Sequence, residues 1–355
     1  MHQAGADRQG VRLPVRRISV LSIGFSLLAL PLAAASQTAA PVQIQSQACE
    51  RIATGPGPDD LAIQGNRLLF SSHDRRRFHR PGEIQLLDTV SGEVRTLKRE
   101  GEPVGLVLRP HGIDLVQRDG EWLLHVVSHD RDLFSDNHRI VIYALRGDTL
   151  HFLQQLESPL LSAPNDIAVA DNGDLYVTNE RSQGSSLVEL ILLERKANVV
   201  VHRAGSGWRV AAGELAFANG IYTKGDKVWV TQTLGEGLMR YVRRPDGSLG
   251  NPEQLGNLSL LDSLHATPDG KLLSPAYPSL INLGLHWQLD NRKARTVLNE
   301  IDPDTGNSHV LFQDSGQQIS AVSSAVILGQ RLYLGQLFES YLLSCPLSTS
   351  STARR

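Results

Sequence analysis

The chain has 355 residues and a formal net charge of −2, and 41% of its residues are hydrophobic. This length and composition are typical of a globular protein with one large hydrophobic core or two smaller ones. The charge balance excludes the strongly basic surface that binds phosphates, so we expect no nucleic acid among the partners of this protein.

Residues 1–35 have the features of a secretory signal peptide. Arginines at positions 8, 12, 16 and 17 precede an apolar run from Ile18 to Leu32, and the small residues Ala33-Ala34-Ala35 follow. We predict cleavage after Ala35 and a periplasmic or secreted mature chain without a membrane span. An uncleaved anchor is the alternative, although the run is short for a membrane span. Residues 36–47 are predicted to form a flexible lead-in.

The mature chain repeats one pattern: a polar pair, alternating apolar residues, a turn and a second apolar strand. In one copy, Asn165-Asp166 precede such a strand, and Asp171-Asn172-Gly173 form the turn of a hairpin. Six copies begin at residues 59, 111, 165, 219, 262 and 323. Spacings of about 43 to 61 residues suit a four-stranded propeller blade. We therefore predict an all-β fold, a six-bladed β-propeller over residues 48–348, with a disordered tail at 349–355; a sandwich would not explain so regular a period.

Few long helices are expected, and residues 185–195 are the best candidate. The two cysteines, Cys49 and Cys345, lie near the two ends of the mature chain. In an exported protein, such a pair is typical of a disulfide that joins the termini, and here it would close the ring of blades. Two free thiols are the alternative.

The polar residues that open the six repeats should meet at one mouth of the central channel, because the innermost strand of each blade lines it. They include four carboxylates and two carboxamides, with no Lys or Arg among them. Burying unpaired charge is costly, so we expect a hard cation with oxygen ligands, Ca²⁺ rather than Mg²⁺ or Zn²⁺. The residues concerned are Asp59, Asp60, His111, Asn165, Asp166, Asn219, Asp262, Ser323 and Ser324.

Several of these stretches resemble motifs of the paraoxonase/arylesterase family of calcium-dependent lactonases. The motifs are GPDDLAI around Asp59, RPHGIDL at 109, VVSHD at 126, PNDIAV at 164, FANGI at 217, LDSLHATPDGKLL at 261 and VILGQRLYLGQLFESYLLSCPL at 326. They span nearly the whole mature chain in the order of the family, and they include the second cysteine.

The resemblance implies a six-bladed propeller with two calcium ions in its channel. It implies a catalytic calcium held by Asp59, Asn165, Asn219 and Asp262, with Ser263 as a further candidate ligand. It also implies a structural calcium held by Asp60, Asp166 and the backbone carbonyl of Ile113. By the same resemblance, His111 is the general base and His129 assists it.

The sequence departs from the family at several of these positions. Asp59 is shorter than the family's Glu, and Ser263 replaces an Asn. Tyr277 stands where the family carries a His near the active site. The segment 279–298 does not align.

The expected function is calcium-dependent hydrolysis of lactones and aryl esters, in which the cation polarises the carbonyl and His111 activates a water. The chain contains no G-x-S-x-G elbow, no H-E-x-x-H and no phosphate-binding loop. One alternative is a gluconolactonase-type sugar lactonase, which usually needs one metal; Asp60 and Asp166 favour two. The other is a non-catalytic propeller that serves as a binding scaffold, which the stretch Asp174-Leu-Tyr-Val-Thr-Asn resembles.

Overall fold

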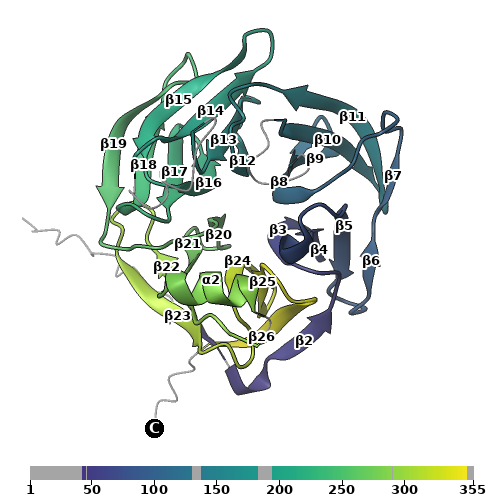
Figure 1. The fold of residues 1–355 in the computed structure, drawn as a ribbon, viewed down its shortest axis with the longest axis vertical. Coiled ribbons are helices and arrows are strands. Elements are labelled where there is room, and N and C mark those ends of the chain that lie inside the picture. Colours follow the sequence, from purple (N-terminus) through teal and green to yellow (C-terminus); the bar gives the residue numbers. More distant parts are fainter. Residues whose placement is uncertain (1–41, 45, 130–136, 183–193, 290, 350–355) are drawn as a thin grey trace, which may run out of the picture. The chain divides into compact units, whose positions relative to one another are not determined.

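A computed structural model describes residues 42–44, 46–129, 137–182, 194–289 and 291–349. This part of the chain forms six sheets arranged in a ring, which confirms the predicted six-bladed β-propeller (Figure 1). The predicted signal peptide, most of the lead-in, the predicted helix apart from its last two residues, and residues 350–355 of the tail lie outside the described residues. Within the described ranges, every helix is too short or too polar to span a membrane.

The first three blades follow one another along the chain. The first contains β3 (Pro58–Gln64), β4 (Arg67–Ser72), β5 (Glu83–Asp88) and β6 (Val94–Thr96). The second contains β8 (Pro110–Arg118), β9 (Glu121–Ser128), β10 (Arg139–Arg146) and β11 (Thr149–Glu157), with β7 (Lys98–Glu100) parallel to β11. The third contains β12 (Pro164–Val169), β13 (Leu175–Asn179), β14 (Ala197–Arg203) and β15 (Gly207–Leu215).

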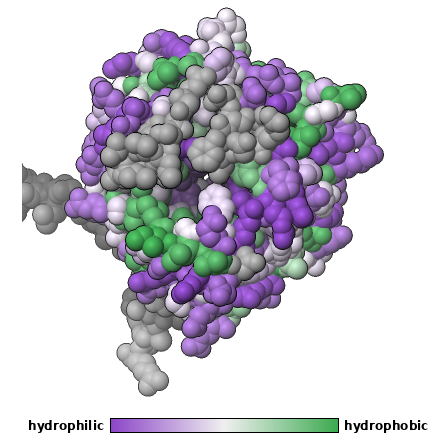
Figure 2. Space-filling view, viewed as in Figure 1, coloured by the Kyte–Doolittle hydropathy of each residue, from purple (hydrophilic) through white to green (hydrophobic). Residues whose placement is uncertain are grey.

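The next two blades have the same order from the channel outward. The fourth contains β16 (Ala218–Lys224), β17 (Lys227–Gln232), β18 (Gly237–Arg243) and β19 (Leu249–Leu255). The fifth contains β20 (His265–Ala266), β21 (Leu272–Ala276), β22 (Thr296–Ile301) and β23 (Ser308–Asp314). Between β21 and β22 lies α2 (Leu280–Gln288), a helix that was not predicted. Figure 2 shows apolar side chains over this helix, where Ile281 is 77% exposed.

The sixth blade closes the ring with strands from both ends of the described chain. It contains β24 (Val322–Leu328), β25 (Arg331–Gln336) and β26 (Tyr341–Thr349), and both β1 (Val42–Ile44) and β2 (Glu50–Ala53) pair with β26. The disulfide Cys49–Cys345 joins the two ends at this blade, as predicted. The lead-in was predicted to be flexible, but its residues 42–44 pair with β26 and residues 46–48 form a short 3-10 helix, η1 (Ser46–Ala48). The prediction is wrong there because β26 extends far enough to offer β1 a partner.

A separate apolar cluster fills each of the six gaps between neighbouring blades. Successive residues of one strand point to opposite gaps. Leu68 and Phe70 of β4 pack toward the sixth blade, and Leu69 packs toward the second. Both faces of each sheet are therefore buried, which explains why these strands are apolar throughout rather than alternating.

Five of the six innermost strands have a β-bulge at their start. In β3, Pro58 pairs with Ser72 and Leu61 with Phe70, so that Asp59 and Asp60 together face the single residue Ser71. The same shift occurs in β8, β12, β16 and β24. The residues that open five of the six repeats are thus bulge residues, which a sheet leaves outside its ladder of hydrogen bonds. In the fifth blade, Asp262 and Ser263 instead precede the short strand β20.

Two bulges require glycine because the next blade comes close. A Cβ atom on Gly112 would lie 2.5 Å from the carbonyl oxygen of Asn165, and one on Gly220 would lie 2.6 Å from the backbone nitrogen of Leu264. Each glycine therefore lets one bulge touch the next blade around the channel.

Replacing Cys345 with Ser is expected to lower the free energy of unfolding by about 5–6 kcal/mol, because the disulfide constrains a very long loop of the unfolded chain. Urea unfolding of the variant and of the wild type, both without reductant, measures the difference. The wild type in reductant is the control and should unfold like the variant. Equal unfolding midpoints for the variant and the oxidised wild type would contradict the prediction.

Candidate active site

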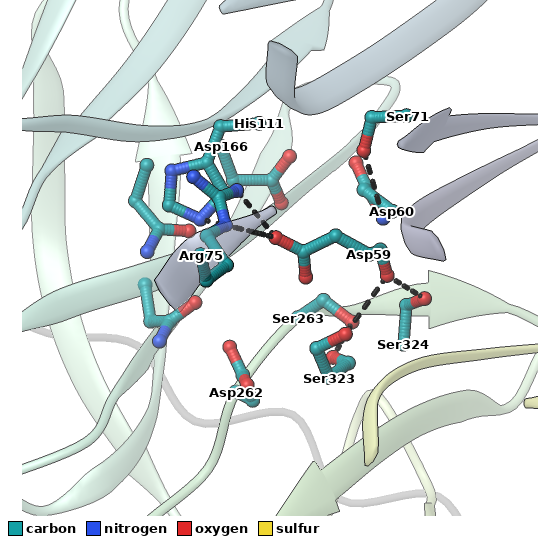
Figure 3. A network of polar contacts seen from close by, with 12 residues as sticks. Asp59, Asp60, Ser71, Arg75, His111, Asp166, Asp262, Ser263, Ser323 and Ser324 are labelled. Carbon is teal, nitrogen blue, oxygen red and sulfur yellow. Dashed lines mark hydrogen bonds and ion pairs between the residues drawn. The ribbon is translucent and has the colours of Figure 1, made fainter. Parts of the chain in front are cut away.

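The bulges, and in the fifth blade the segment just before β20, bring the predicted site residues to the channel. Asp59, Asn165, Asn219 and Asp262 come from four different blades, and each is at most 8% exposed. Figure 3 shows Arg75 and His111 on one side of the Asp59 carboxylate, with Asp262 and Ser263 on another. Ser323 donates a hydrogen bond of 2.9 Å to the carbonyl oxygen of Asp59, and Ser324 donates to the same oxygen. The last blade is thereby tied to the first at the site.

A buried guanidinium enters this group, contrary to the expectation that no Lys or Arg lies among the carboxylates. Nη2 and Nε of Arg75 lie 2.5 and 3.1 Å from Oδ2 of Asp59. Arg75 begins the short helix η2 (Arg75–Arg77), and the Asp74 carboxylate caps this helix by accepting from the backbone nitrogens of Arg76 and Arg77. The expectation was wrong because the connection between β4 and β5 folds back over the channel mouth.

The Arg75 side chain is not fully satisfied. It is 4% exposed, and its Nη1 atom has no hydrogen-bond partner among the described residues. An N–H group that is buried in this way favours an oxygen acceptor in the site, either water or substrate.

Two histidines lie beside Asp59. Nδ1 of His111 is 2.8 Å from Nε2 of His129, and Nε2 of His111 is 3.6 Å from Oδ2 of Asp59. Burial lowers the pKa of both imidazoles well below its usual value, and the charge of Arg75 lowers the pKa of His111 further. Both rings are therefore neutral at physiological pH, so either can accept a proton.

A third histidine follows in the same row. Nδ1 of His138 lies 3.1 Å from Nδ1 of His129, and the side chain of His138 is buried. Sequence analysis did not single out His138. In the sequence, His138 is only a histidine nine residues after His129. The strand register is needed to show that the two side chains are neighbours.

The residues that the resemblance implies as ligands of the catalytic calcium differ in their hydrogen-bond partners. Oδ1 of Asn219 is buried without a hydrogen-bond partner in the described part of the chain. The hydroxyl of Tyr277 donates to Oδ2 of Asp262. The Asn165 amide donates to Oε1 of Glu180 at 2.5 Å, and Glu180, a site residue that was not predicted, has 13% of its side chain exposed. Burial raises the pKa of Asp262 well above its usual value, and the neighbouring Asp59 raises it further.

The inner carboxylates connect neighbouring blades. Oδ2 of Asp60 accepts from the backbone nitrogen of Ile113 at 2.7 Å, and Oδ2 of Asp166 accepts from that of Ile221 at 2.9 Å. Asp114, also not predicted, accepts from the nitrogen of Val169 at 2.7 Å. Each carboxylate thus satisfies a donor at the edge of the next innermost strand.

The inner end of the site opens into a cavity. Nε2 of His265 lies 2.9 Å from Oδ1 of Asp60, and the cavity of about 320 Å³ is lined by His265, Asp114 and Asp166 among mostly apolar residues. Burial raises the pKa of Asp166 well above its usual value, and the charge of Asp60 raises it further.

The donor chemistry fits a hard divalent cation. The orphaned Oδ1 of Asn219 and the buried carboxylates of Asp166 and Asp262 offer oxygen atoms of the kind that Ca²⁺ prefers. Across the described ranges, however, no three His, Cys, Asp or Glu side chains are arranged to hold a metal ion. The number of ions and the ligand roles of the residues predicted from the sequence therefore stay predictions.

Comparison with known proteins supports this architecture. A sequence model of a protein family described as Arylesterase matches residues 58–347. No curated protein sequence matches the chain significantly.

Three solved structures illustrate the fold. A gluconolactonase from Xanthomonas campestris has a TM-score of 0.54 and 16% identity, covering 88% of this chain and 99% of that one. Regucalcin, a calcium-binding protein from Agrobacterium tumefaciens, has a TM-score of 0.51 and 13% identity over 87% and 95% of the two chains. The PQQ-bound aldose sugar dehydrogenase from Streptomyces coelicolor has a TM-score of 0.54 and 14% identity, covering 87% of this chain and 98% of that one. These likenesses show the fold alone, since one fold carries several chemistries.

The ion pair of Arg75 and Asp59 is open to a stability test. We expect Arg75→Met to lower the free energy of unfolding in the presence of a chelator by about 3–5 kcal/mol, because the variant leaves a buried carboxylate without its partner. Added calcium should reduce this loss by neutralising Asp59. Urea unfolding with chelator and with calcium measures both effects.

Arg77→Met is the matched control, because Arg77 lies in the same short helix with 60% of its side chain exposed. It should change the unfolding free energy by about 1 kcal/mol or less. An Arg75→Met variant as stable as this control in chelator would show that Asp59 does not depend on Arg75.

Proposed function

Because the chain belongs to the arylesterase family, we propose that it is a calcium-dependent hydrolase that opens lactones and cleaves aryl esters. The observation that carries the proposal is the contact of 2.8 Å between the imidazoles of His111 and His129 at the channel mouth. This pair lies within 3.6 Å of Asp59, one of the oxygen ligands that the family resemblance implies for calcium. This arrangement supports the proposal, because it would place a general base next to the cation that polarises the substrate carbonyl.

We assign the outer calcium to Asp59, Asn165, Asn219 and Asp262, and the inner calcium to Asp60, Asp166 and the backbone carbonyl of Ile113. When bound, the outer ion supplies a Lewis acid that polarises the substrate carbonyl and stabilises negative charge on its oxygen. The orphaned Oδ1 of Asn219 supports the outer assignment.

The chain's own residues move the proton. Nε2 of His111 takes a proton from a water as the water oxygen attacks the carbonyl carbon. Nε2 of His129, 2.8 Å from Nδ1 of His111, accepts a hydrogen bond that strengthens as His111 becomes charged. The bond between the carbonyl carbon and the leaving oxygen then breaks, and His111 returns its proton to that oxygen.

Arg75 has a separate part in this reaction. Its Nη2 atom holds Asp59 in place, and its Nη1 atom, which has no hydrogen-bond partner among the described residues, can donate to an oxygen of the substrate. Burial lowers the pKa of His111, and the positive charge of Arg75 lowers it further, which favours the neutral ring before the reaction.

We also propose that the protein is exported. The Cys49–Cys345 disulfide supports this location, because such bonds persist in oxidising compartments. The features of residues 1–35 as a signal peptide agree with it.

Calcium dependence has a direct test. The purified wild type is expected to carry two calcium ions per chain by elemental analysis, and a panel of lactones and aryl esters should be hydrolysed only without chelator. Asp166→Asn is expected to keep about one ion, because it removes a charge from the inner site alone. A wild type that hydrolyses the panel equally well in chelator would contradict the calcium role, and one that hydrolyses nothing would favour a binding scaffold.

His111→Gln tests the base. We expect kcat to fall about 10²- to 10⁴-fold with an unchanged calcium count, because an amide cannot accept the proton. His151→Gln, on β11 with a third of its side chain exposed, is the control and should behave as the wild type. Undiminished lactone hydrolysis by His111→Gln would show that the mechanism is wrong.

A further inference from the structure

Three imidazoles form a row from the channel into the second blade. The strand register explains their order: Ser128, at the end of β9, pairs with Arg139, at the start of β10, so that the flanking residues His129 and His138 are neighbours. The rings of His129 and His138 are almost perpendicular, at 88°, with centroids 4.9 Å apart. The exposed fraction falls along the row, from 13% of the His111 side chain to 2% of His129 and 1% of His138.

The two nitrogen–nitrogen contacts in this row are coupled. A neutral imidazole has one nitrogen that donates and one that accepts, so each contact needs a donor on one ring and an acceptor on the other. Only two arrangements satisfy both contacts. In the first, His111 donates from Nδ1 to His129, and His129 donates from Nδ1 to Nδ1 of His138. In the second, both bonds run the other way.

Only the first arrangement leaves His111 able to act as a base. It places the proton of His111 on Nδ1, so that Nε2, the nitrogen 3.6 Å from Asp59, is free to accept. The second arrangement places a proton on Nε2 and removes that capacity. The nitrogen of His138 that faces His129 therefore decides which arrangement the row adopts.

We propose that His138 is a positioning residue, which accepts the Nδ1 proton of His129 at its own Nδ1 and thereby holds His111 with an unprotonated Nε2 toward the channel. The inference rests on the proposed function, in which His111 is the base. It adds a third histidine to the pair that the resemblance implies, and it assigns that histidine an acceptor role rather than a packing role.

The tautomers of the wild type can be measured without any substrate. Two-bond ¹⁵N–¹H correlation spectra of the ¹⁵N-labelled protein should show His111 and His129 protonated at Nδ1 and His138 protonated at Nε2. Protonation of His111 and His129 at Nε2 would overturn the proposal. Because this measurement needs no activity, it separates a failure of the positioning role from a failure of the proposed hydrolase function.

Two replacements of His138 separate accepting from packing. In His138→Asn, the amide oxygen lies near the former Nδ1 position and can accept from His129, so we expect kcat within about threefold of the wild type. His138→Phe keeps a ring but no acceptor, and we expect kcat to fall about 10- to 100-fold while KM changes less than about twofold. The spectra of His138→Phe should also show a mixture of tautomers at His111.

His125→Phe is the matched control, because His125 is a buried histidine of β9 with no hydrogen bond to the row. It should retain kcat within about twofold. A folded His138→Phe variant with wild-type kcat and unchanged tautomers would overturn the proposal. If His138→Phe does not fold, the wild-type spectra and the kinetics of His138→Asn still test the proposal. A folded His138→Asn variant that keeps the wild-type tautomers but loses most of its kcat would also contradict the proposal.

Discussion

Two residues at the start of five of the six innermost strands lie outside the ladder of hydrogen bonds, and their polar groups need other partners. A buried polar group without a partner costs roughly 1–3 kcal/mol, and a buried charge costs more. The molecule meets this cost partly by bonding one blade to the next, as the carboxylates of Asp60 and Asp166 do with the backbone nitrogens of Ile113 and Ile221. The same bulges that open the sheets therefore hold the ring together around its channel.

Hydrogen bonds between blades do not remove the excess negative charge. Arg75 pairs with Asp59, and His265 contacts Asp60. Within the described part of the chain, no basic side chain forms an ion pair with Asp166 or Asp262, and burial raises the pKa of both. Buried carboxylates of this kind can lose their unfavourable charge in two ways: they take up protons, or they bind a cation. We propose calcium for this reason, and the measured metal content is therefore the most direct test of the proposed function.

The fold does not decide the chemistry. A gluconolactonase, regucalcin and a sugar dehydrogenase share it at low sequence identity, so the side chains at the bulges carry the functional information. In this chain, one bulge places His111 near the carboxylate of Asp59, and His129 and His138 continue from it as a row of imidazoles in contact. The imidazole of His111 beside the carboxylate of Asp59 is the feature on which the proposed mechanism depends.

Local pattern determined much of this protein. Hairpin turns and apolar strands at a regular long spacing were sufficient to predict six blades, and in five repeats the opening residues marked the position of a bulge. Both features depend on neighbours close in sequence. The pairing of Cys49 with Cys345 followed because the chain has only these two cysteines. The tertiary structure alone decided that Arg75 reaches Asp59, that Tyr277 donates to Asp262, and that His138 continues the histidine row. These contacts join loops and strand ends whose sequence has no period, so only the packing of the blades brings their side chains together.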